Sequence, residues 1–399
     1  MSETHPIVSG FRFAGVSCGI KDSGKPDLGL ILADDAFPTA AMFTRNRIQA
    51  APVVLAAERM ERGRAQAILV NSGNANSCTG KAGLDAARDT TIALADALDM
   101  NEDLVLPAST GIIGQQLPSE RIEAAVPQLI EDLSPDGVNR FAEAIRTTDR
   151  WPKVASIQFG IGYKETATLV GVAKGAGMIH PDMATTLGFV LTDAPMSSSF
   201  LKTSLRRAVE QTFNAMTVDG ETSTNDSMFA MASGRVDTPA LRGSDRDAKR
   251  FQDAMIDVLG ELAKSIVRDG EGAQRVVRLE VAGGPSESAS RQVAERVATS
   301  LLVKAAIHGC DPNWGRILSA AGMAPVAIDL NKVEIRIGKV VVFKKGAGLG
   351  PSAEADAREQ MRQAEYTIRI KLGSGTGNAH YLLCDIGPEY IRVNSAYST

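Results

Sequence analysis

The chain has 399 residues, 44% of them hydrophobic and 23% charged, which suits a globular protein with a large core and room for two or three lobes. Its net charge of −4 is mild and the signs are interspersed, so nothing indicates a nucleic-acid-binding surface or an acidic tail. The four cysteines lie far apart without a CxxC pair and the four histidines are scattered, which argues against a disulfide framework and a zinc site.

Strand-like and helix-like segments alternate in the first half of the chain. Residues 67–70 (Ala-Ile-Leu-Val) predict a buried strand that runs into a turn at 71–74 (Asn-Ser-Gly-Asn). Helical spacing of apolar residues follows over about 84–98. The next apolar run, 104–106, is soon followed by Ser109-Thr110-Gly111, a group of residues that is typical of a turn. Alternation on both sides of 162–164 (Gly-Tyr-Lys) predicts a β-hairpin.

The second half has long amphipathic helices and half-buried strands. Leu201, Leu205, Ala208 and Thr212 keep helical spacing, and the clearest helix carries Phe251, Met255, Leu259, Leu262 and Ile266. Alternation over 333–337 and 366–372 predicts two more strands. The expected fold class is therefore mixed α/β (α+β), with antiparallel or mixed sheets layered with helices.

Residues 174–193 contain the segment with the most chemical information. Lys174-Gly-Ala-Gly177 resembles a phosphate loop only weakly, because the lysine of a Walker loop follows its glycines. Glycine clusters of this kind are usually turns. The complete sequence of the segment from Lys174 to Asp193 is a far more specific signal than its glycines alone.

This segment and several stretches elsewhere together resemble the ornithine acetyltransferase family, the glutamate N-acetyltransferases of the arginine cycle. The resemblance covers nearly the full chain. The stretches that carry the resemblance, in order, are Ala41-Met-Phe-Thr-Arg-Asn46, Asn71-Ser-Gly-Asn-Ala-Asn76, Ser109-Thr-Gly111, Thr147-Thr-Asp149, the central segment, Asp219-Gly-Glu-Thr-Ser-Thr-Asn-Asp226, Arg268-Asp-Gly-Glu-Gly-Ala273, His308-Gly-Cys-Asp-Pro-Asn313 and Arg392-Val-Asn-Ser-Ala-Tyr397.

The resemblance implies that the chain is cleaved between Ala184 and Thr185, giving an α chain (1–184) and a β chain (185–399). Thr185 would then be the nucleophile of an N-terminal-nucleophile-like architecture, and its new α-amine, with a pKa of about 7.7–8.0, would be the adjacent base. Thr110 and Gly111 match the family's oxyanion-hole pair, which stabilises charge on the acetyl oxygen.

The family's substrate-binding positions fall on Thr148, Lys174, Thr185, Glu271, Asn394 and Thr399. We expect Lys174 to meet a carboxylate and Glu271 an ammonium group, while Asn394 and Thr399 close the pocket. The bland alternative is that Lys174 and Glu271 are solvated surface charges.

Other polar groups near the motifs have simpler explanations. His180 could be a base, but the amine of Thr185 makes it unnecessary. The stretch with Asp219, Glu221 and Asp226 lacks EF-hand spacing and is expected to support the site through hydrogen bonds. Cys310 is expected to be a packed thiol.

At two positions the chain differs from the residue that is most frequent in the family. Asp182 stands where asparagine is frequent and could raise the pKa of the new amine. Thr186 stands where methionine is frequent. These two departures bear on the substrate preference more than on the type of reaction.

The implied reaction is ping-pong: Thr185 takes the acetyl group from N2-acetylornithine and gives it to glutamate, with no metal or other cofactor. Some relatives also accept acetyl-CoA, and no pattern here separates the two kinds. The resemblance further implies a heterotetramer of two α and two β chains. Because no leader or membrane-spanning run is present, we expect a cytoplasmic protein without nucleic-acid or membrane partners.

Three alternatives stay open at this stage. One is a self-processing amidohydrolase or aminopeptidase, in which water replaces the amine acceptor. Another is an acetyltransferase with a different acceptor. The third is an amino-acid-binding protein that is never cleaved.

Overall fold

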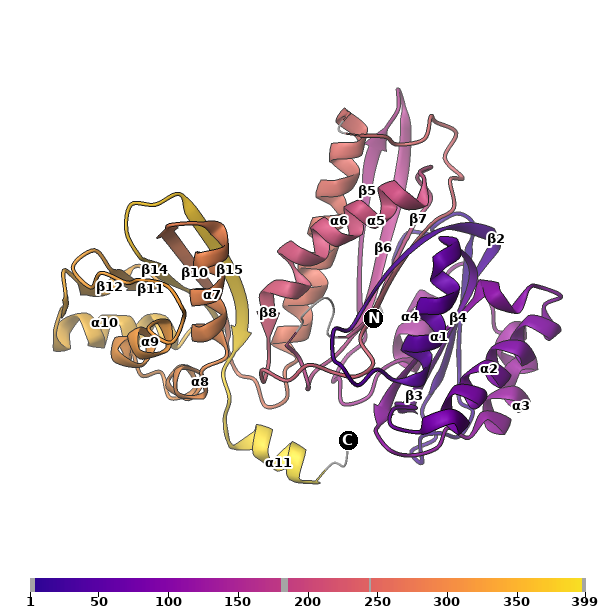
Figure 1. Cartoon of the computed structure of the whole chain (residues 1–399), viewed down its shortest axis with the longest axis horizontal. Helices are drawn as coiled ribbons and strands as arrows, with labels where there is room; N and C mark the ends of the chain where they lie inside the picture. Colours follow the sequence, from indigo (N-terminus) through magenta and orange to yellow (C-terminus); the bar gives the residue numbers. More distant parts are fainter. Residues whose placement is uncertain (1–3, 181–185, 244, 397–399) are drawn as a thin grey trace.

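The computed structural model describes residues 4–180, 186–243 and 245–396. Within them the chain forms two lobes, each built on a mixed sheet with helices packed against it (Figure 1). The strands are β1 Phe11–Val16, β2 Leu28–Phe43, β3 Arg64–Asn74, β4 Val105–Ile112, β5 Lys153–Ile161, β6 Glu165–Lys174, β7 Leu187–Thr192, β8 Met216–Thr217, β9 Ser227–Ala232, β10 Val276–Gly284, β11 Glu334–Ile337, β12 Val340–Lys344, β13 Ala347–Gly348, β14 Glu365–Lys371 and β15 Gly377–Cys384. The helices are α1 Ala51–Arg59, α2 Gly80–Ala97, α3 Ser119–Glu131, α4 Val138–Ala144, α5 Ser198–Gln211, α6 Arg246–Arg268, α7 Glu287–Ala298, α8 Leu301–His308, α9 Trp314–Ala321, α10 Pro351–Met361 and α11 Pro388–Ala396.

The first lobe contains the larger sheet, in the order β4-β3-β2-β9-β7-β6-β5, with β1 added beside β2. The β3–β4 and β7–β9 pairs are parallel and the other pairs are antiparallel. The second sheet runs β13-β12-β11-β14-β10-β15-β8 and is also mixed. The expected mixed α/β class is confirmed. Its description as N-terminal-nucleophile-like stays a prediction because it depends on Thr185.

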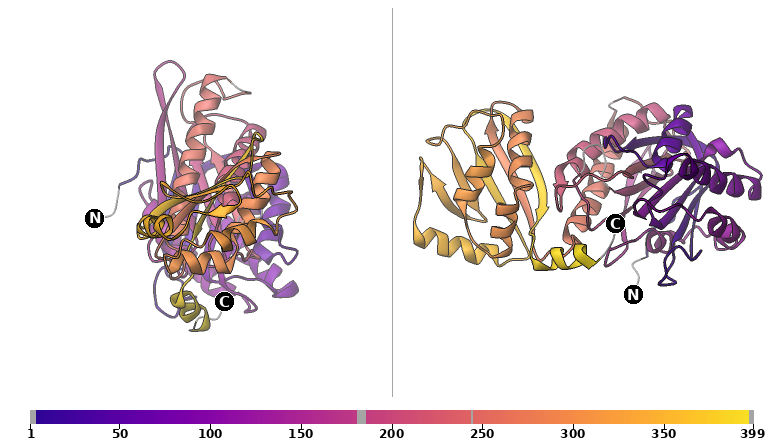
Figure 2. Two further views of the ribbon diagram at one scale, coloured as in Figure 1. Left: turned by 90° about the vertical axis from the view of Figure 1, so that its left-hand side faces the viewer. Right: turned by 60° about the horizontal axis from the view of Figure 1, so that its bottom comes forward.

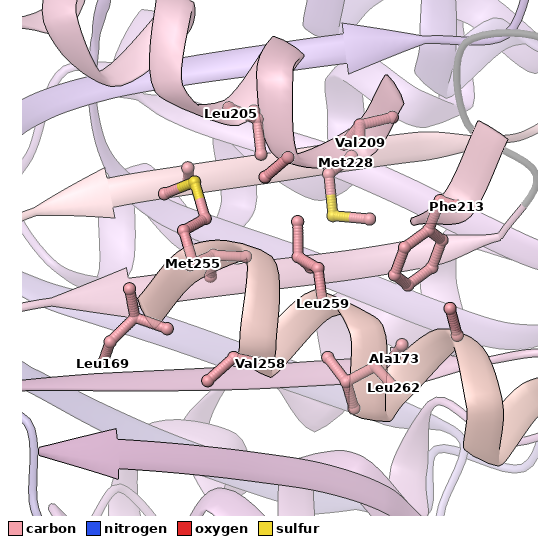
Figure 3. Close-up of a cluster of buried hydrophobic side chains, with 14 of the residues drawn as sticks. Leu169, Ala173, Leu205, Val209, Phe213, Met228, Met255, Val258, Leu259 and Leu262 are labelled. Atoms are coloured by element: carbon pink, nitrogen blue, oxygen red, sulfur yellow. The ribbon is translucent and has the colours of Figure 1, made fainter. Parts of the chain in front are cut away.

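Helices α5 and α6 cover one face of the first sheet and make its main core (Figure 3). Leu259 of α6 and Leu205 of α5 are fully buried against Leu169 of β6 and Met228 of β9. Truncation of such a side chain, for example Leu259→Ala, removes about 2–5 kcal/mol of stability. The rigid sheet beneath these helices holds the strand ends that form the site described below.

The predicted helix around Phe251 is confirmed as α6, and all five apolar residues that define it are buried. The side chain of Asp245 accepts a hydrogen bond from the backbone N–H of Ala248, which caps its start. At the other end Arg268 lies in the last turn, where a cation complements the helix dipole. The helix therefore delivers the segment after Arg268 to a fixed place.

The predicted turn at Asn71-Ser-Gly-Asn74 is wrong, because these residues continue β3. Likewise Ser109, Thr110 and Gly111 belong to β4 and do not follow it. β3 and β4 stay paired to Gly73 and Gly111, and Ser109 Oγ donates to Asn71 Oδ1 at 2.5 Å. Polar side chains that satisfy one another within a sheet do not require a turn.

The predicted chain boundary falls inside the first lobe. β6 and β7, which flank residue 184 in sequence, are neighbouring antiparallel strands with Lys174 opposite Leu187. Cleavage there would leave two chains that share one sheet. Among the described helices, none is long and apolar enough to cross a membrane.

The last helix, α11, leaves the second lobe and reaches back to the first (Figures 1 and 2). Asn394 of α11 donates a hydrogen bond to the Glu271 carboxylate, just beyond α6. The end of the described chain is thereby brought to the strand ends of the first sheet.

Candidate active site

A cavity of about 200 Å³ lies where β4 and β6 end, β7 and β9 begin, and α11 approaches. All the described residues that the sequence assigned to the site line it: Thr110, Gly111, Thr148, Lys174, Glu271 and Asn394. Thr186 also contributes to the wall. Ala184, Thr185, Asp182 and Thr399 lie outside the described residues. The structure thus brings together residues that are up to 284 positions apart in the sequence.

The expected oxyanion pair lies at the end of β4. Gly111 has φ +134°, and a Cβ on it would lie 2.3 Å from the carbonyl carbon of Gly73 and 2.5 Å from the nitrogen of Asn74. Since these are backbone atoms of β3, only glycine fits. The close approach brings the Thr110–Gly111 peptide to the cavity wall without a turn.

Lys174, at the end of β6, is 9% exposed, so the alternative of a solvated surface charge does not hold. Its Nζ donates a hydrogen bond to Thr110 Oγ1 at 3.1 Å. Burial lowers the pKa of Lys174, while the carboxylates of Asp149, Asp226 and Glu271 oppose that shift. In its ammonium form Lys174 can only donate, and the hydroxyl hydrogen of Thr110 is then available to another acceptor.

Glu271 and Asn394 form one rim of the cavity. Asn394 Nδ2 donates to Glu271 Oε2 at 2.7 Å, and Asn394 itself is exposed on α11. A Cβ on Gly177 would lie 2.5 Å from the same Oε2 atom. The absence of a side chain at Gly177 therefore gives the Glu271 carboxylate its place.

The predicted supporting role of the 219–226 stretch is confirmed by its hydrogen bonds. The carboxylate of Asp219 accepts from the backbone N–H groups of Met178 at 2.6 Å and Ile179 at 2.8 Å. Asn225 Nδ2 donates to the carbonyl groups of Ala75 and Ser109 at 2.6 and 2.9 Å. These bonds tie the loop before β9 to β4 and to the segment after β6.

Asp226 differs from its neighbours in this stretch. It is 2% exposed, it lines the cavity, and its Oδ2 atom has no hydrogen-bond partner among the described residues. Burial raises the pKa of this carboxyl group well above its usual value, against the opposing effects of Ser223 and Lys174. Proton loss from this carboxyl group is therefore disfavoured in the folded protein.

Neither His180 nor Cys310 lines the cavity. His180 Nε2 is 3.4 Å from Glu295 of α7, and the thiol of Cys310 donates to the carbonyl of Met361 while packing against the second core. Cys310 is thus a packed thiol, as expected. No group of three or more histidine, cysteine, aspartate or glutamate side chains is placed to hold a metal ion within residues 4–180, 186–243 and 245–396.

Sequence reasoning missed several residues of the site. Tyr390 of α11 lines the cavity, but nothing local distinguishes it from a surface tyrosine. Asn225 was only part of a motif, although an asparagine amide inside a strand-flanking polar run is a frequent backbone bridge. Asp269 was only part of the 268–273 motif and Lys153 belonged to none, and no local pattern pairs them because their partnership depends on tertiary contact.

Comparison with known proteins identifies the family. The ArgJ family model matches residues 12–399. The arginine biosynthesis bifunctional protein ArgJ of Syntrophotalea carbinolica is 46% identical over 393 residues, which are 98% of this chain and 99% of that protein. The ArgJ protein of Geobacter sulfurreducens is 41% identical over 395 residues, 98% of this chain and all of that protein.

Among solved structures, the arginine biosynthesis bifunctional protein ArgJ of Bacillus halodurans is similar with a TM-score of 0.50 and 36% identity. The match covers 52% of this chain and 98% of that chain. The resemblance read from the motifs is confirmed by matches of this length and identity. The chain belongs to the ArgJ family.

Proposed function

We propose that the chain cuts itself between Ala184 and Thr185, and that Thr185 then carries an acetyl group from N2-acetylornithine to glutamate. As a member of its family the chain is an acetyltransferase of arginine biosynthesis, a glutamate N-acetyltransferase. The observation that supports the assignment of residues is that Thr110, Gly111, Lys174 and their hydrogen-bonding neighbours line one common cavity.

The first step is cleavage of the chain. Thr185 Oγ1 attacks the carbonyl carbon of Ala184, the peptide C–N bond breaks, and the hydroxyl proton passes to the released amine. Water then hydrolyses the ester to give the two chains. In support, Thr186, the next residue, lines the cavity and its carbonyl accepts a hydrogen bond from the N–H of Ser227 at 3.1 Å.

Acetyl transfer then proceeds in two halves. Thr185 Oγ1 attacks the acetyl carbonyl of N2-acetylornithine, its proton passes by way of the new α-amine to the leaving nitrogen, and ornithine departs. The amine of glutamate attacks the threonine ester and returns a proton to the oxygen. One amide replaces a similar one, so the proposal needs no nucleotide, metal or other cofactor, and acetyl-CoA could form the same ester.

Charge that develops on the acetyl oxygen needs donors in fixed positions. The hydroxyl of Thr110 and the N–H of Gly111 are the proposed pair, and Lys174 orients the first by occupying a lone pair of its oxygen. Removal of one such donor lowers kcat by about 10²–10³-fold in other enzymes.

The substrate is proposed to be selected by side chains at the rim of the cavity and by further polar groups of the site. The Glu271 carboxylate suits an ammonium group of ornithine, with Asn394 beside it. Thr148 lines the wall near Lys174, and Thr399 belongs to the proposal by its place in the motif pattern alone. A buried cation at Lys174 adds attraction for the carboxylate that both amino acids carry.

The proposed assembly is two α chains and two β chains in the cytoplasm. Because β6 and β7 pair along their length, the α and β chains of one protomer would remain bound through the first sheet after cleavage. Dissociation would separate β2 from β9 as well as β6 from β7 and expose four unpaired strand edges, which is unfavourable.

Intact mass of fresh protein beside Thr185→Ala tests the proposal. We expect fragments of 184 and 215 residues from the natural sequence and an uncleaved variant. A natural chain that stays whole would contradict cleavage and favour the binding-protein alternative. Release of free acetate from N2-acetylornithine without dependence on glutamate would instead favour the amidohydrolase.

A further inference from the structure

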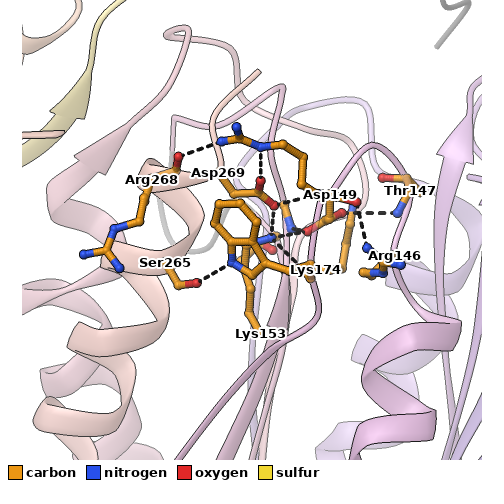
Figure 4. Close-up of polar contacts among 12 residues, drawn as sticks. Arg146, Thr147, Asp149, Lys153, Lys174, Ser265, Arg268 and Asp269 are labelled. Carbon is orange, nitrogen blue, oxygen red and sulfur yellow. Dashed lines mark hydrogen bonds and ion pairs between the residues drawn. The ribbon is translucent and has the colours of Figure 1, made fainter. Parts of the chain in front are cut away.

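Three segments of the cavity wall are linked through one buried ion-pair network, centred on Lys153 at the start of β5. Lys153 is 2% exposed, and its Nζ lies 2.6 Å from Asp149 Oδ1 and 2.6 Å from Asp269 Oδ2 (Figure 4). Neither carboxylate side chain is exposed to solvent. The lysine therefore joins the turn before β5 to the end of α6.

The Asp149 arm reaches two parts of the wall. Asp149 directly follows Thr148, and its Oδ1 atom also accepts a hydrogen bond from the N–H of Gly175 at 2.6 Å. Gly175 directly follows Lys174. One carboxylate oxygen thus fixes the backbone beside both Thr148 and Lys174.

The Asp269 arm reaches the third part of the wall. Asp269 precedes Glu271 by two residues, and its carboxylate also accepts from Arg150, through Nε at 2.7 Å and the backbone N–H at 3.0 Å. The Arg150 guanidinium further donates to the carbonyl of Arg268, the last residue of α6. The end of α6, and with it the following segment that carries Glu271, is therefore held to the 149–150 turn from two sides.

Such a network is costly as a source of stability alone. Desolvation of a buried ion pair often exceeds the Coulomb attraction, so apolar replacements are frequently neutral or stabilising. Here the two carboxylates are balanced by Lys153 and Arg150, and the positions of all four are tied to the cavity wall. This network fixes the relative positions of residues at the cavity wall, which an apolar core would not do.

We propose that Lys153 is a positioning residue, which with Asp149 and Asp269 fixes the spacing of Thr148, Lys174 and Glu271 around the bound amino acid. This inference rests on the proposed function, since it assumes that those three residues contact substrate. Small displacements of binding groups reduce rates and affinities steeply. Loss of Lys153 should consequently weaken both amino-acid substrates together.

The test compares Lys153→Met with Lys153→Arg, using KM and kcat for N2-acetylornithine and glutamate. We expect Lys153→Met to raise both KM values roughly tenfold or more, with a smaller change in kcat, and Lys153→Arg to restore much of the affinity. If Lys153→Met is not recovered folded, Asp269→Asn keeps the shape of the network and should raise both KM values in the same way.

Lys304→Met is the matched control. Lys304 is also fully buried, in α8 of the second lobe, where its Nζ donates to the carbonyl of Cys384 at 2.6 Å. Its loss should reduce thermal stability and leave both KM values unchanged. Unchanged KM values in Lys153→Met, or an equal rise in Lys304→Met, would overturn the inference. Absence of acetyl transfer by the natural protein would instead overturn the proposed function.

Discussion

The side-chain nitrogen of Lys174 lies 3.1 Å from the hydroxyl oxygen of Thr110, although their strands, β6 and β4, have β7, β9, β2 and β3 between them in the first sheet. The sequence suggested a different role for Lys174, as a partner of a substrate carboxylate. The hydrogen bond makes the lysine a neighbour of the proposed oxyanion donor, and the two roles predict different kinetics.

A double-mutant cycle of Lys174→Met and Thr110→Val separates these roles. If Lys174 acts by orienting Thr110, each variant should lower kcat about 100-fold and the double variant should lose little more. If Lys174 binds the carboxylate independently, the losses should multiply and KM should rise. Lys164→Met, on the exposed hairpin turn, is the control and should retain full activity.

Gly177→Ala is expected to fold normally and to bind substrate poorly. The residue lies outside the left-handed region, but its new Cβ would meet the carboxylate of Glu271 at 2.5 Å and displace it. We expect KM for N2-acetylornithine to rise roughly tenfold with little change in melting temperature. Gly160→Ala, where the nearest atom is 3.7 Å away, should change neither quantity. Equal KM values for the two variants would contradict the placement of Glu271 in the site.

Gly111→Ala should damage both stability and activity, because its Cβ would collide with backbone atoms of β3. Gly114 also has positive φ, at +85°, but a Cβ added there would meet no described atom within 4 Å. Gly114→Ala should cost about 1 kcal/mol and keep activity, whereas Gly111→Ala should cost about 3 kcal/mol and abolish it. Chemical unfolding and acetyl-transfer assays of both variants measure the difference, and equal losses would refute the crowding argument.

Asp226→Asn is expected to stabilise the protein at neutral pH. The folded-state pKa of Asp226 is raised, so the folded protein binds a proton that the unfolded chain releases above about pH 3.9, and stability falls as pH rises beyond that value. The neutral amide removes this penalty. Melting temperatures at pH 4 and pH 7.5 should show a gain at the higher pH alone.

Asp149→Asn is the control of opposite sign. Burial raises the pKa of Asp149, but Lys153, Lys174 and the N–H of Gly175 together hold it below the usual range. Its carboxylate therefore contributes stability above the unfolded pKa, and that contribution is lost as pH falls through the folded value. Asp149→Asn should lower the melting temperature at pH 7.5, and a gain there would contradict the assigned ion pairs.

Much of the fold and the outline of the site could be predicted from the sequence. Helices such as α6 follow from the spacing of Phe251, Met255 and Leu259, since a 3.6-residue period buries one face wherever the helix packs. The hairpin of β5 and β6 follows from alternation around a short turn. The motifs indicated the family, and the resemblance assigned six of the described cavity residues to the site, because the chemistry of acyl transfer restricts the residue types that can serve there.

Only the tertiary structure decided how those residues act on one another. Asn71 and Ser109 look like turn residues until they are seen to satisfy each other between paired strands. Lys153 and Asp269 are 116 positions apart, and Lys174 is separated from Thr110 by 64, so no local pattern joins them. Residue type and spacing determine local conformation and chemical capacity, whereas burial and through-space electrostatics depend on which distant segments the packed sheet brings into contact.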